Sequence, residues 1–504
     1  MKLQKLLCAT LAVLLLFSVA SCNKNNGGNT DSGSKDEQVT LYVDLHSLRP
    51  SLSSTPTAEN PDVVLATKYI IKAFEEENPN IKIKVDRTKD VTGDSESASQ
   101  WLINKINNND CPAIVFTWGT KFQDRNYYVD LTPYLEQPNE YVEGNTKWKD
   151  IFHNYVWVDP NVIDANDKIV AVPVLLSPGT QVAYYYNKNL FQGKTLPNNW
   201  ETLISTAQEF NAMGKVGFAP WDNLTKVTLD CWQFKFSVGP SFVGGQMDVL
   251  DYNGDNVVTM YESIRGVKEG KYNPVTNAYA RDVFLQMKRF FTTGGANKGP
   301  LTNNWTNPMS TEFTLGKVAM IEDGTWSIQK MDSNVDMEFE YGMMAPVLID
   351  KATSQYALNS ISYKKGTEVK HEVNTCFNIM KAAVKDKPEV LDAAIKFLKF
   401  LSSPESIEAI VSENASYVPA TVGSESNSLL DGWLSQDFPE IPQGKWPLGF
   451  IAEYDDKIDR LFQQWFQNKI EDEEFYEGLN EYQQKGADSI ISSMNINTAG
   501  WAMQ

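Results

Sequence analysis

The chain has 504 residues, of which 42% are hydrophobic, so it can bury a core large enough for two or three domains or one large two-lobed unit. Its formal net charge of −19 argues against a nucleic-acid partner, whose phosphates it would repel, and otherwise favours solubility. Only three histidines are present, and they are far apart in the sequence. A metal enzyme or a histidine-dependent nucleophile is therefore poorly supported.

Residues 1–21 are predicted to be a signal peptide. Lys2 and Lys5 form a basic region, and an apolar run from Leu6 to Ala20 follows. The next residues, Val-Ala-Ser-Cys ending at Cys22, resemble a bacterial lipobox, in which the Cys thiol is acylated and becomes the new N-terminus. An ordinary signal peptide with an incidental cysteine is the alternative. The first interpretation predicts a protein held at the extracytoplasmic face of a bacterial membrane by a lipid on Cys22.

Residues 22–38 are predicted to be a flexible tether, because they consist mainly of Asn, Gly, Ser and Asp. A coil of this length spans about 20–25 Å, enough to lift a domain clear of a lipid surface. After residue 38 no apolar run approaches the ~18 residues that a membrane span requires. We therefore expect the protein to be anchored by its lipid and not to cross the bilayer.

Strands and helices alternate in the first part of the folded chain. Apolar patterns predict strands at residues 39–44, 81–85 and 113–116, with a helix starting at Asn60-Pro61 and another around residues 101–106. Such alternation is typical of an α/β fold with a parallel sheet covered on both faces. Further strands are predicted at residues 169–176, 182–186, 341–347 and 375–380, and amphipathic helices close the chain.

The stretch from Phe313 to Trp326 combines several of these signals. A helix is expected to end at Gly316, and Val318 to Ile321 is an apolar strand. Glu322-Asp323-Gly324 is a charged turn signal, and Trp326 is expected to start the next helix. Ligands of open α/β sheets bind at the carboxyl ends of strands, so an acid beside an aromatic face here suits a sugar. A core tryptophan beside a turn is the alternative.

Asp251, Asn253, Asp255 and Glu262 occupy positions 1, 3, 5 and 12 of a calcium-binding EF-hand loop. Asn256 stands where Gly is usual, and Asn tolerates a positive φ better than most residues. Against calcium, the residues before Asp251 read as a loop because of Gly244 and Gly245. A plain hairpin turn is the other interpretation.

The order of motifs resembles that of family 1 extracellular solute-binding proteins, the lipoprotein receptors of carbohydrate ABC importers. The motifs that carry the resemblance are the lipobox, residues 71–81, 112–116, 129–135, 169–173, 185–191, 197–203 and 393–398, the stretch at 313–326 and Ile441-Pro-Gln443. The resemblance implies a type II periplasmic-binding-protein fold, in which hinge strands join two lobes around a ligand cleft. It divides the chain into lobe 1 (residues 39–177 and 347–417) and lobe 2 (residues 178–346 and 418–504).

The same resemblance suggests residues for the ligand site. Trp326 and Trp118 are expected to stack on sugar rings, and Asp323, Asp44 and His46 are expected to bind hydroxyl groups. The further aromatic candidates are Trp221, Trp232, Trp305 and Trp446. For each tryptophan the alternative is a packing role, and for His46 it is a local hydrogen bond.

The function that the resemblance implies is capture of a sugar or oligosaccharide by lobe closure and its delivery to the permease subunits of an ABC importer. Such a receptor is expected to be a monomer without catalytic activity and, calcium apart, without a cofactor. One alternative is a secreted glycoside hydrolase, which needs two carboxyl groups about 5 Å or about 6.5–9.5 Å apart. The other is a lipoprotein that presents its ligand to a sensor.

Overall fold

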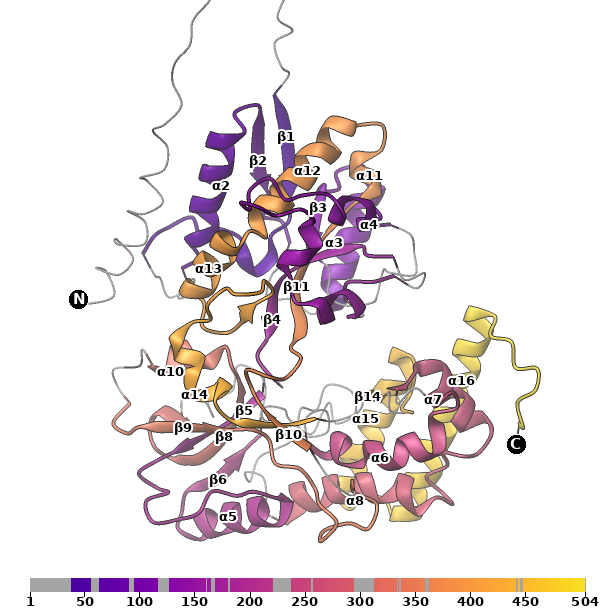
Figure 1. Cartoon of the computed structure of the whole chain (residues 1–504). Coiled ribbons are helices and arrows are strands. Elements are labelled where there is room, and N and C mark those ends of the chain that lie inside the picture. The colour runs from indigo at the N-terminus through magenta and orange to yellow at the C-terminus, as the bar shows by residue number, and fades with distance from the viewer. Residues whose placement is uncertain are drawn as a thin grey trace, which may run out of the picture.

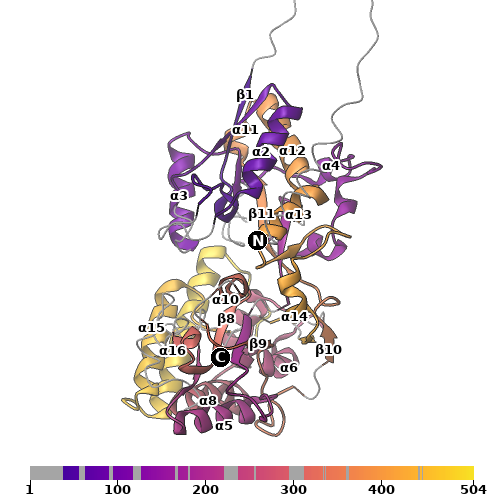
Figure 2. The same cartoon turned by 90° about the vertical axis from the view of Figure 1, so that its left-hand side faces the viewer.

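The computed structural model describes residues 38–55, 63–89, 95–116, 127–159, 161–164, 168–179, 182–220, 237–254, 257–293, 312–332, 334, 337–358, 362–440, 443–444 and 447–503. Their helices and strands gather into two lobes, which can be told apart in both perpendicular views and are joined by a narrower region (Figures 1 and 2). Among the helices in these ranges, none combines the length and the apolar character that a bilayer span requires.

The first lobe is built on a mixed sheet of six described strands. In spatial order they are β12 (Val418–Pro419), β4 (Ala171–Ser177), β11 (Glu372–Ile379), β3 (Ile114–Phe116), β1 (Val39–Val43) and β2 (Ile81–Val85). β1 is parallel to both β2 and β3, whereas β11 is antiparallel to β3 and β4. The carboxyl ends of β1, β2, β3 and β4 therefore lie at one edge of the sheet, where β4 leaves for the second lobe.

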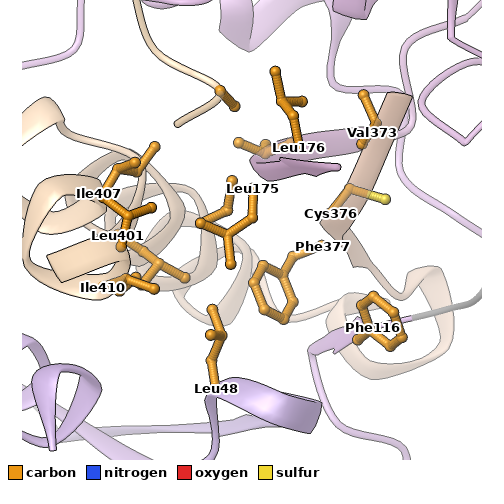
Figure 3. Close-up of a cluster of buried hydrophobic side chains, with 14 of the residues drawn as sticks. Leu48, Phe116, Leu175, Leu176, Val373, Cys376, Phe377, Leu401, Ile407 and Ile410 are labelled. Atoms are coloured by element: carbon orange, nitrogen blue, oxygen red, sulfur yellow. The ribbon is translucent and has the colours of Figure 1, made fainter. Parts of the chain in front are cut away.

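Helices cover this sheet. They are η1 (His46–Leu48), α2 (Ala66–Glu77), α3 (Ser95–Asn107), α4 (Thr132–Leu135), η3 (Trp148–Ile151), η4 (Asn154–Val158), α11 (Lys381–Val384), α12 (Pro388–Leu401) and α13 (Pro404–Glu413). All of them except α3 contribute to the main core of the lobe, whereas Leu102 of α3 packs with Val115 and Val170 in a separate buried cluster. Figure 3 shows Leu175 of β4 and Phe377 of β11 pointing toward Leu401 and Ile407 of the helices, with Leu48 beside them. The buried side chain of Leu48 thus ties the turn after β1 to the core of the lobe.

The start of α2 is stabilised from far away in the sequence. The backbone N–H groups of Leu65 and Ala66 donate to the carboxylate of Glu413, at the end of α13, over 2.8–2.9 Å. A carboxylate at this position satisfies donors that a helix start leaves open and complements the helix dipole. The predicted start at Asn60-Pro61 lies outside the described residues.

The second lobe contains a smaller sheet of four described strands, in the order β6 (Val216–Ala219), β8 (Val318–Gly324), β5 (Val182–Asn187) and β9 (Tyr341–Met344). β5 enters from the first lobe and is antiparallel to β8, so Val182 pairs with Gly324. The carboxyl end of β8 therefore lies beside the chain crossing. Thr325, which follows β8, donates to the carbonyl of Ser416, just before β12 of the larger sheet, over 3.1 Å.

Helices and short ribbons complete this lobe. The helices are α5 (Trp200–Ala212), α6 (Gly239–Leu250), α7 (Met260–Lys268), α8 (Ala278–Thr292), α10 (Ser327–Asp332), η6 (Ser428–Leu430), α14 (Asp431–Leu434), α15 (Ala452–Phe466) and α16 (Asp472–Met494). The ribbons pair β10 (Ser362–Lys365) with β13 (Asp437–Glu440), and β7 (Val257–Val258) with β14 (Gln443–Gly444). The lower part of Figure 1 shows α15 and α16 beside α6, α7 and α8.

The crossing from β4 to β5 is held by contacts from later segments. Gly179 has φ +63°, and a Cβ there would lie 2.7 Å from the Phe438 ring, so this position requires Gly. The Trp433 indole N–H donates to the carbonyl of Pro178 over 2.9 Å. Gly179 N–H donates to Nδ1 of His371, which precedes β11, over 3.0 Å. Two of the chain connections between the lobes are therefore bonded to each other.

The strand pattern bears on the proposed division into lobe segments. Val347 and Ile349 are buried in the core of the smaller sheet, although the division assigns residues 347–417 to the first lobe. Ile349 N–H donates to the hydroxyl of Ser241 in α6 over 2.8 Å. The chain joins the larger sheet again only at β11.

Candidate functional site

A buried ion pair joins the carboxyl ends of three strands in the first lobe. The Lys89 ammonium lies 2.7 Å from Oδ2 of Asp44, and both side chains are almost fully buried. Lys89 also donates to the carbonyl of Phe116 over 2.8 Å. Because Asp44 follows β1, Lys89 follows β2 and Phe116 ends β3, a single cation ties all three strand ends together.

Asp44 is fully engaged by groups of the protein. Its Oδ1 accepts the His46 backbone N–H over 3.0 Å, and its Oδ2 accepts from Lys89 and, at 3.4 Å, from the Phe116 N–H. The expectation that Asp44 binds a hydroxyl group of the ligand stays a prediction. The role that its contacts support is positioning of the strand ends.

His46 lies in the turn that Asp44 stabilises. Its φ of +46° falls in the left-handed region, which non-glycine residues rarely adopt and which is common at functional sites. Its ring lies 4.3 Å from the Phe116 ring. Burial lowers the pKa of His46 to about 3, and the positive charges of Lys89 and Arg49 contribute to this shift. At neutral pH the His46 ring is therefore uncharged, and it is buried at this edge of the sheet.

A second polar network supports the loop that carries Lys89. Asp86 accepts from the Thr88 N–H over 2.7 Å and the Lys89 N–H over 3.1 Å, and it also bonds Tyr42 and Lys105. Burial raises the pKa of Asp86, but the hydrogen bonds outweigh burial and bring the pKa down to about 2. This carboxylate therefore stays charged and keeps the loop in place.

Two residues at this edge were not predicted from the sequence. Lys89 is one, and Trp101 of α3 is the other. The Trp101 indole N–H donates to the Thr88 hydroxyl over 3.0 Å, and the Lys89 ammonium lies 5.1 Å from the centre of its ring. The position of Lys89, just beyond an apolar strand, was the available signal, but its partner Asp44 is 45 residues away.

In the second lobe the carboxyl end of β8 differs from the prediction. The strand continues through Asp323 and Gly324, and the expected turn over residues 322–324 is wrong. Pairing of residues 320–324 with β5 keeps these residues extended, and the turn falls at Thr325-Trp326. The carboxylate of Asp323 is buried and accepts from the Gly324 N–H and the Ser327 hydroxyl, each over 2.7 Å.

Trp326 lies flat against the backbone of Gly324. A Cβ placed on Gly324 would lie 2.3–2.4 Å from three atoms of the indole, spread around its six-membered ring. Only a residue without a side chain leaves room for this ring position. Trp326 itself is half-buried, so part of it reaches solvent at the end of β8. This arrangement fixes an aromatic surface beside the chain crossing.

The remaining aromatic candidates cannot be placed. Trp118, Trp221, Trp232, Trp305 and Trp446 lie outside the described residues. Their proposed contacts with a ligand stay predictions. Phe116 and Ala219 end the strands that precede Trp118 and Trp221 in the sequence.

The candidate calcium loop connects two helices. α6 ends at Leu250 and α7 begins at Met260, so the expectation that no helix precedes Asp251 is wrong. The physical reason is packing: a Cβ on Gly245 would lie 2.7 Å from the Tyr279 ring, so the helix needs Gly at this position. The helix–loop–helix context and the oxygen donors of the loop suit a calcium ion.

Hydrogen bonds within the loop also support a purely structural role. Glu262 forms a capping box with Thr259 at the start of α7 and accepts the Tyr252 N–H over 2.9 Å. Asp251 accepts the Gly254 N–H over 2.7 Å, and Asp255 lies outside the described residues. Within the described part of the chain, no three His, Cys, Asp or Glu residues are grouped as metal ligands. Calcium binding stays a prediction.

Comparisons with known proteins agree with this architecture. A family model described as bacterial extracellular solute-binding protein matches residues 69–437. A curated protein, the multiple sugar-binding protein of Streptococcus mutans serotype c, is 24% identical over 218 residues. That match covers 42% of this chain and 42% of the relative, so the chain matches less than half of the relative's length.

Solved structures share the fold at low sequence identity. A family 1 extracellular solute-binding protein from Bifidobacterium longum subsp. infantis has a TM-score of 0.57 at 15% identity, covering 89% of this chain and 100% of its own. RafE in complex with raffinose has a TM-score of 0.54 at 17% identity, with coverages of 89% and 100%. Maltose-bound MalE3 of T. maritima has a TM-score of 0.57 at 16% identity, with coverages of 88% and 99%. The two-lobed periplasmic-binding-protein fold expected from the sequence is thus confirmed.

Substitution of Lys89 tests its role in joining the strand ends. Lys89→Met leaves Asp44 buried without its cation, so we expect unfolding free energy to fall by about 3–5 kcal/mol. Adding Asp44→Asn to that variant removes the unpaired charge and should restore part of the loss. Denaturant unfolding of both single variants and the double variant measures the coupling. Additive effects would contradict the proposed role.

Acidification is expected to weaken the fold below pH 6.5. Burial and the nearby His153 lower the pKa of His371 to about 4, so the folded state holds this ring neutral while the unfolded chain protonates it near 6.5. The stabilisation is complete above pH 6.5 and is lost as pH falls toward 4. His371→Asn keeps an acceptor for the Gly179 N–H, and it should reduce the pH dependence of melting in this window. An unchanged dependence would contradict the assignment.

Calcium should raise the melting temperature if the loop at residues 251–262 binds it, and a chelator should reverse the rise. Glu262→Gln should remove the effect, whereas Glu477→Gln, on the surface of α16, should keep it. If calcium does not change the melting temperature, the loop does not bind calcium and the role of Glu262 is the capping box of α7.

Proposed function

The chain belongs to the family of bacterial extracellular solute-binding proteins, and we propose that it is the sugar-binding receptor of an ABC importer. Its ligand would be a sugar or oligosaccharide bound between the lobes. The observation that carries this proposal is the Trp326 ring held flat on Gly324 beside the crossing. An aromatic face suits the C–H face of a sugar ring, and adjacent polar groups suit its hydroxyls.

Both lobes would contribute to this site. The carboxyl ends of β1, β2 and β3 lie at the edge from which β4 leaves for the second lobe, and the carboxyl end of β8 lies where β5 enters. A ligand between these edges would contact Trp101 on one side and Trp326 on the other, whereas His46 lies buried beneath the first of these edges. It would stabilise a closed arrangement because only that arrangement allows both sets of contacts.

The lipid anchor and the permease complete the proposal. Acylation of Cys22 would hold the protein at the extracytoplasmic face of the membrane, and residues 22–38 would tether the lobes above it. The closed form would then deliver the sugar to the transmembrane subunits. Curated and structural relatives described as sugar-binding or sugar-bound support the choice of ligand class.

A saccharide panel with matched variants tests the proposal. A sugar present at about 100 times its dissociation constant should stabilise the protein by about 2.7 kcal/mol, and it should be recovered uncleaved. Gly324→Ala should displace the Trp326 ring and weaken binding about tenfold or more, and Trp326→Ala should do the same. Trp501→Ala, near the C-terminus against Tyr261, is the control and should bind normally.

Two outcomes would contradict the proposal. Cleavage of the sugar would indicate a hydrolase. If no saccharide in the panel raises the melting temperature, the proposed ligand class is wrong. If Gly324→Ala binds the sugar as tightly as the parent protein, the Trp326 platform is not part of the site.

A further inference from the structure

Two arginines clamp the loops that follow β1 and β2 to each other. Arg49, after η1, donates to the carbonyl of Lys89 over 3.2 Å. Arg87, after β2, donates to the carbonyl of Pro50 over 2.8 Å. Each guanidinium thus reaches across to the other loop. Since a guanidinium carries five N–H donors, each retains donors for another partner.

The two positive charges are neighbours, because Arg49 bonds the loop that carries Arg87 and Arg87 bonds the residue next to Arg49. Partial burial lowers the pKa of Arg87, and the charge of Arg49 lowers it further. The charge of Arg49 also contributes to the lowered pKa of His46. Both arginines therefore belong to the same edge of the sheet as the candidate ligand site.

Neither arginine has a carboxylate partner within the part of the chain that the structure describes. The neighbouring acids are engaged elsewhere: Asp44 pairs with Lys89, and Asp86 pairs with Lys105. The chain as a whole has 64 acidic and 45 basic residues, so acidic partners are plentiful in its composition. Placing two guanidinium groups together without a carboxylate costs repulsion that an incoming anion would relieve.

We propose that Arg49 and Arg87 form an anion-binding subsite that receives the carboxylate or sulfate group of an acidic saccharide. This inference rests on the proposed function and specifies its ligand class. Arginine suits this task because its planar fork can bond two oxygens of one anionic group at once. The buried ring of His46 lies near Arg49 and is uncharged at neutral pH, so it adds no third positive charge to the pair.

The position of the pair favours a bound saccharide over an anionic membrane surface. The arginines follow the carboxyl ends of β1 and β2, whereas the chain that precedes the fold joins the opposite end of β1 at Val39. Figure 1 shows this end of β1 at the top of the first lobe, away from the second lobe. Arg87 is exposed and Arg49 is half-buried, so a soluble ligand can reach both.

Calorimetric titration with matched ligands tests this subsite. Trigalacturonate is compared with its neutral methyl ester, and a sulfated disaccharide with its desulfated form, so the two pairs distinguish carboxylate from sulfate. We expect one acidic ligand to bind about tenfold or more tightly than its neutral form, because charge-assisted hydrogen bonds contribute strongly. Added salt should weaken binding of the acidic ligand and leave the affinity for its neutral form unchanged.

Substitutions at Arg87 test whether the preference for acidic over neutral saccharides depends on this subsite. Arg87→Gln should remove the preference for the acidic ligand, and Arg87→Lys should retain part of it. Lys469→Gln removes one exposed charge from the loop after α15 and should leave the preference intact. The melting temperatures of the ligand-free variants show whether each variant is folded. The salt dependence of binding is measured on the parent protein, so it tests the subsite even if a variant fails to fold.

The outcomes separate this inference from the proposed function. Neutral saccharides that bind as tightly as acidic ones would overturn the subsite while the sugar receptor stands. An equal loss for both ligands in Arg87→Gln would also overturn it. If no saccharide of either kind binds, the proposed function fails and the subsite fails with it.

Discussion

The ion pair between Lys89 and Asp44 is the contact on which the candidate site depends. It is buried, so neither charge is stable there without the other, and the ammonium also bonds the end of β3. Asp44 in turn holds the unusual backbone of His46. Three strand ends, the loop that carries Arg87 and the ring of Trp101 are thereby fixed relative to one another. A preformed surface of this kind loses little entropy when a ligand binds.

The strand ends at the edges where the two lobes meet have a similar arrangement of side chains. In each, a carboxylate at a strand end is engaged by the protein, as Asp44 is by Lys89 and Asp323 is by Ser327. In each, a tryptophan lies close by on a rigid support, as Trp101 is held by Thr88 and Trp326 lies on Gly324. Trp433 and His371 bond the crossing at Pro178 and Gly179, and Thr325 bonds Ser416 between the lobes, so relative movement of the lobes must involve these contacts.

Sequence patterns predicted the strands well because apolar runs and their flanking turns are local. Residues 81–85 were expected as a strand and form β2, and residues 182–186 fall within β5. The end of β8 was placed too early because pairing with β5 keeps Asp323 and Gly324 extended, and that pairing is not visible in local sequence. The helix before Asp251 was missed because Gly245, which reads as a loop signal, serves packing against Tyr279. Lys89 was missed because its partners, Asp44 and the carbonyl of Phe116, lie far from it in the sequence.

Small-angle X-ray scattering during titration with the saccharide panel would show whether a sugar binds between the two lobes and draws them together. If it does, at least one saccharide should reduce the radius of gyration in a saturable manner and be recovered with unchanged mass. A radius of gyration that no saccharide changes, or a sugar recovered in fragments, would contradict the account.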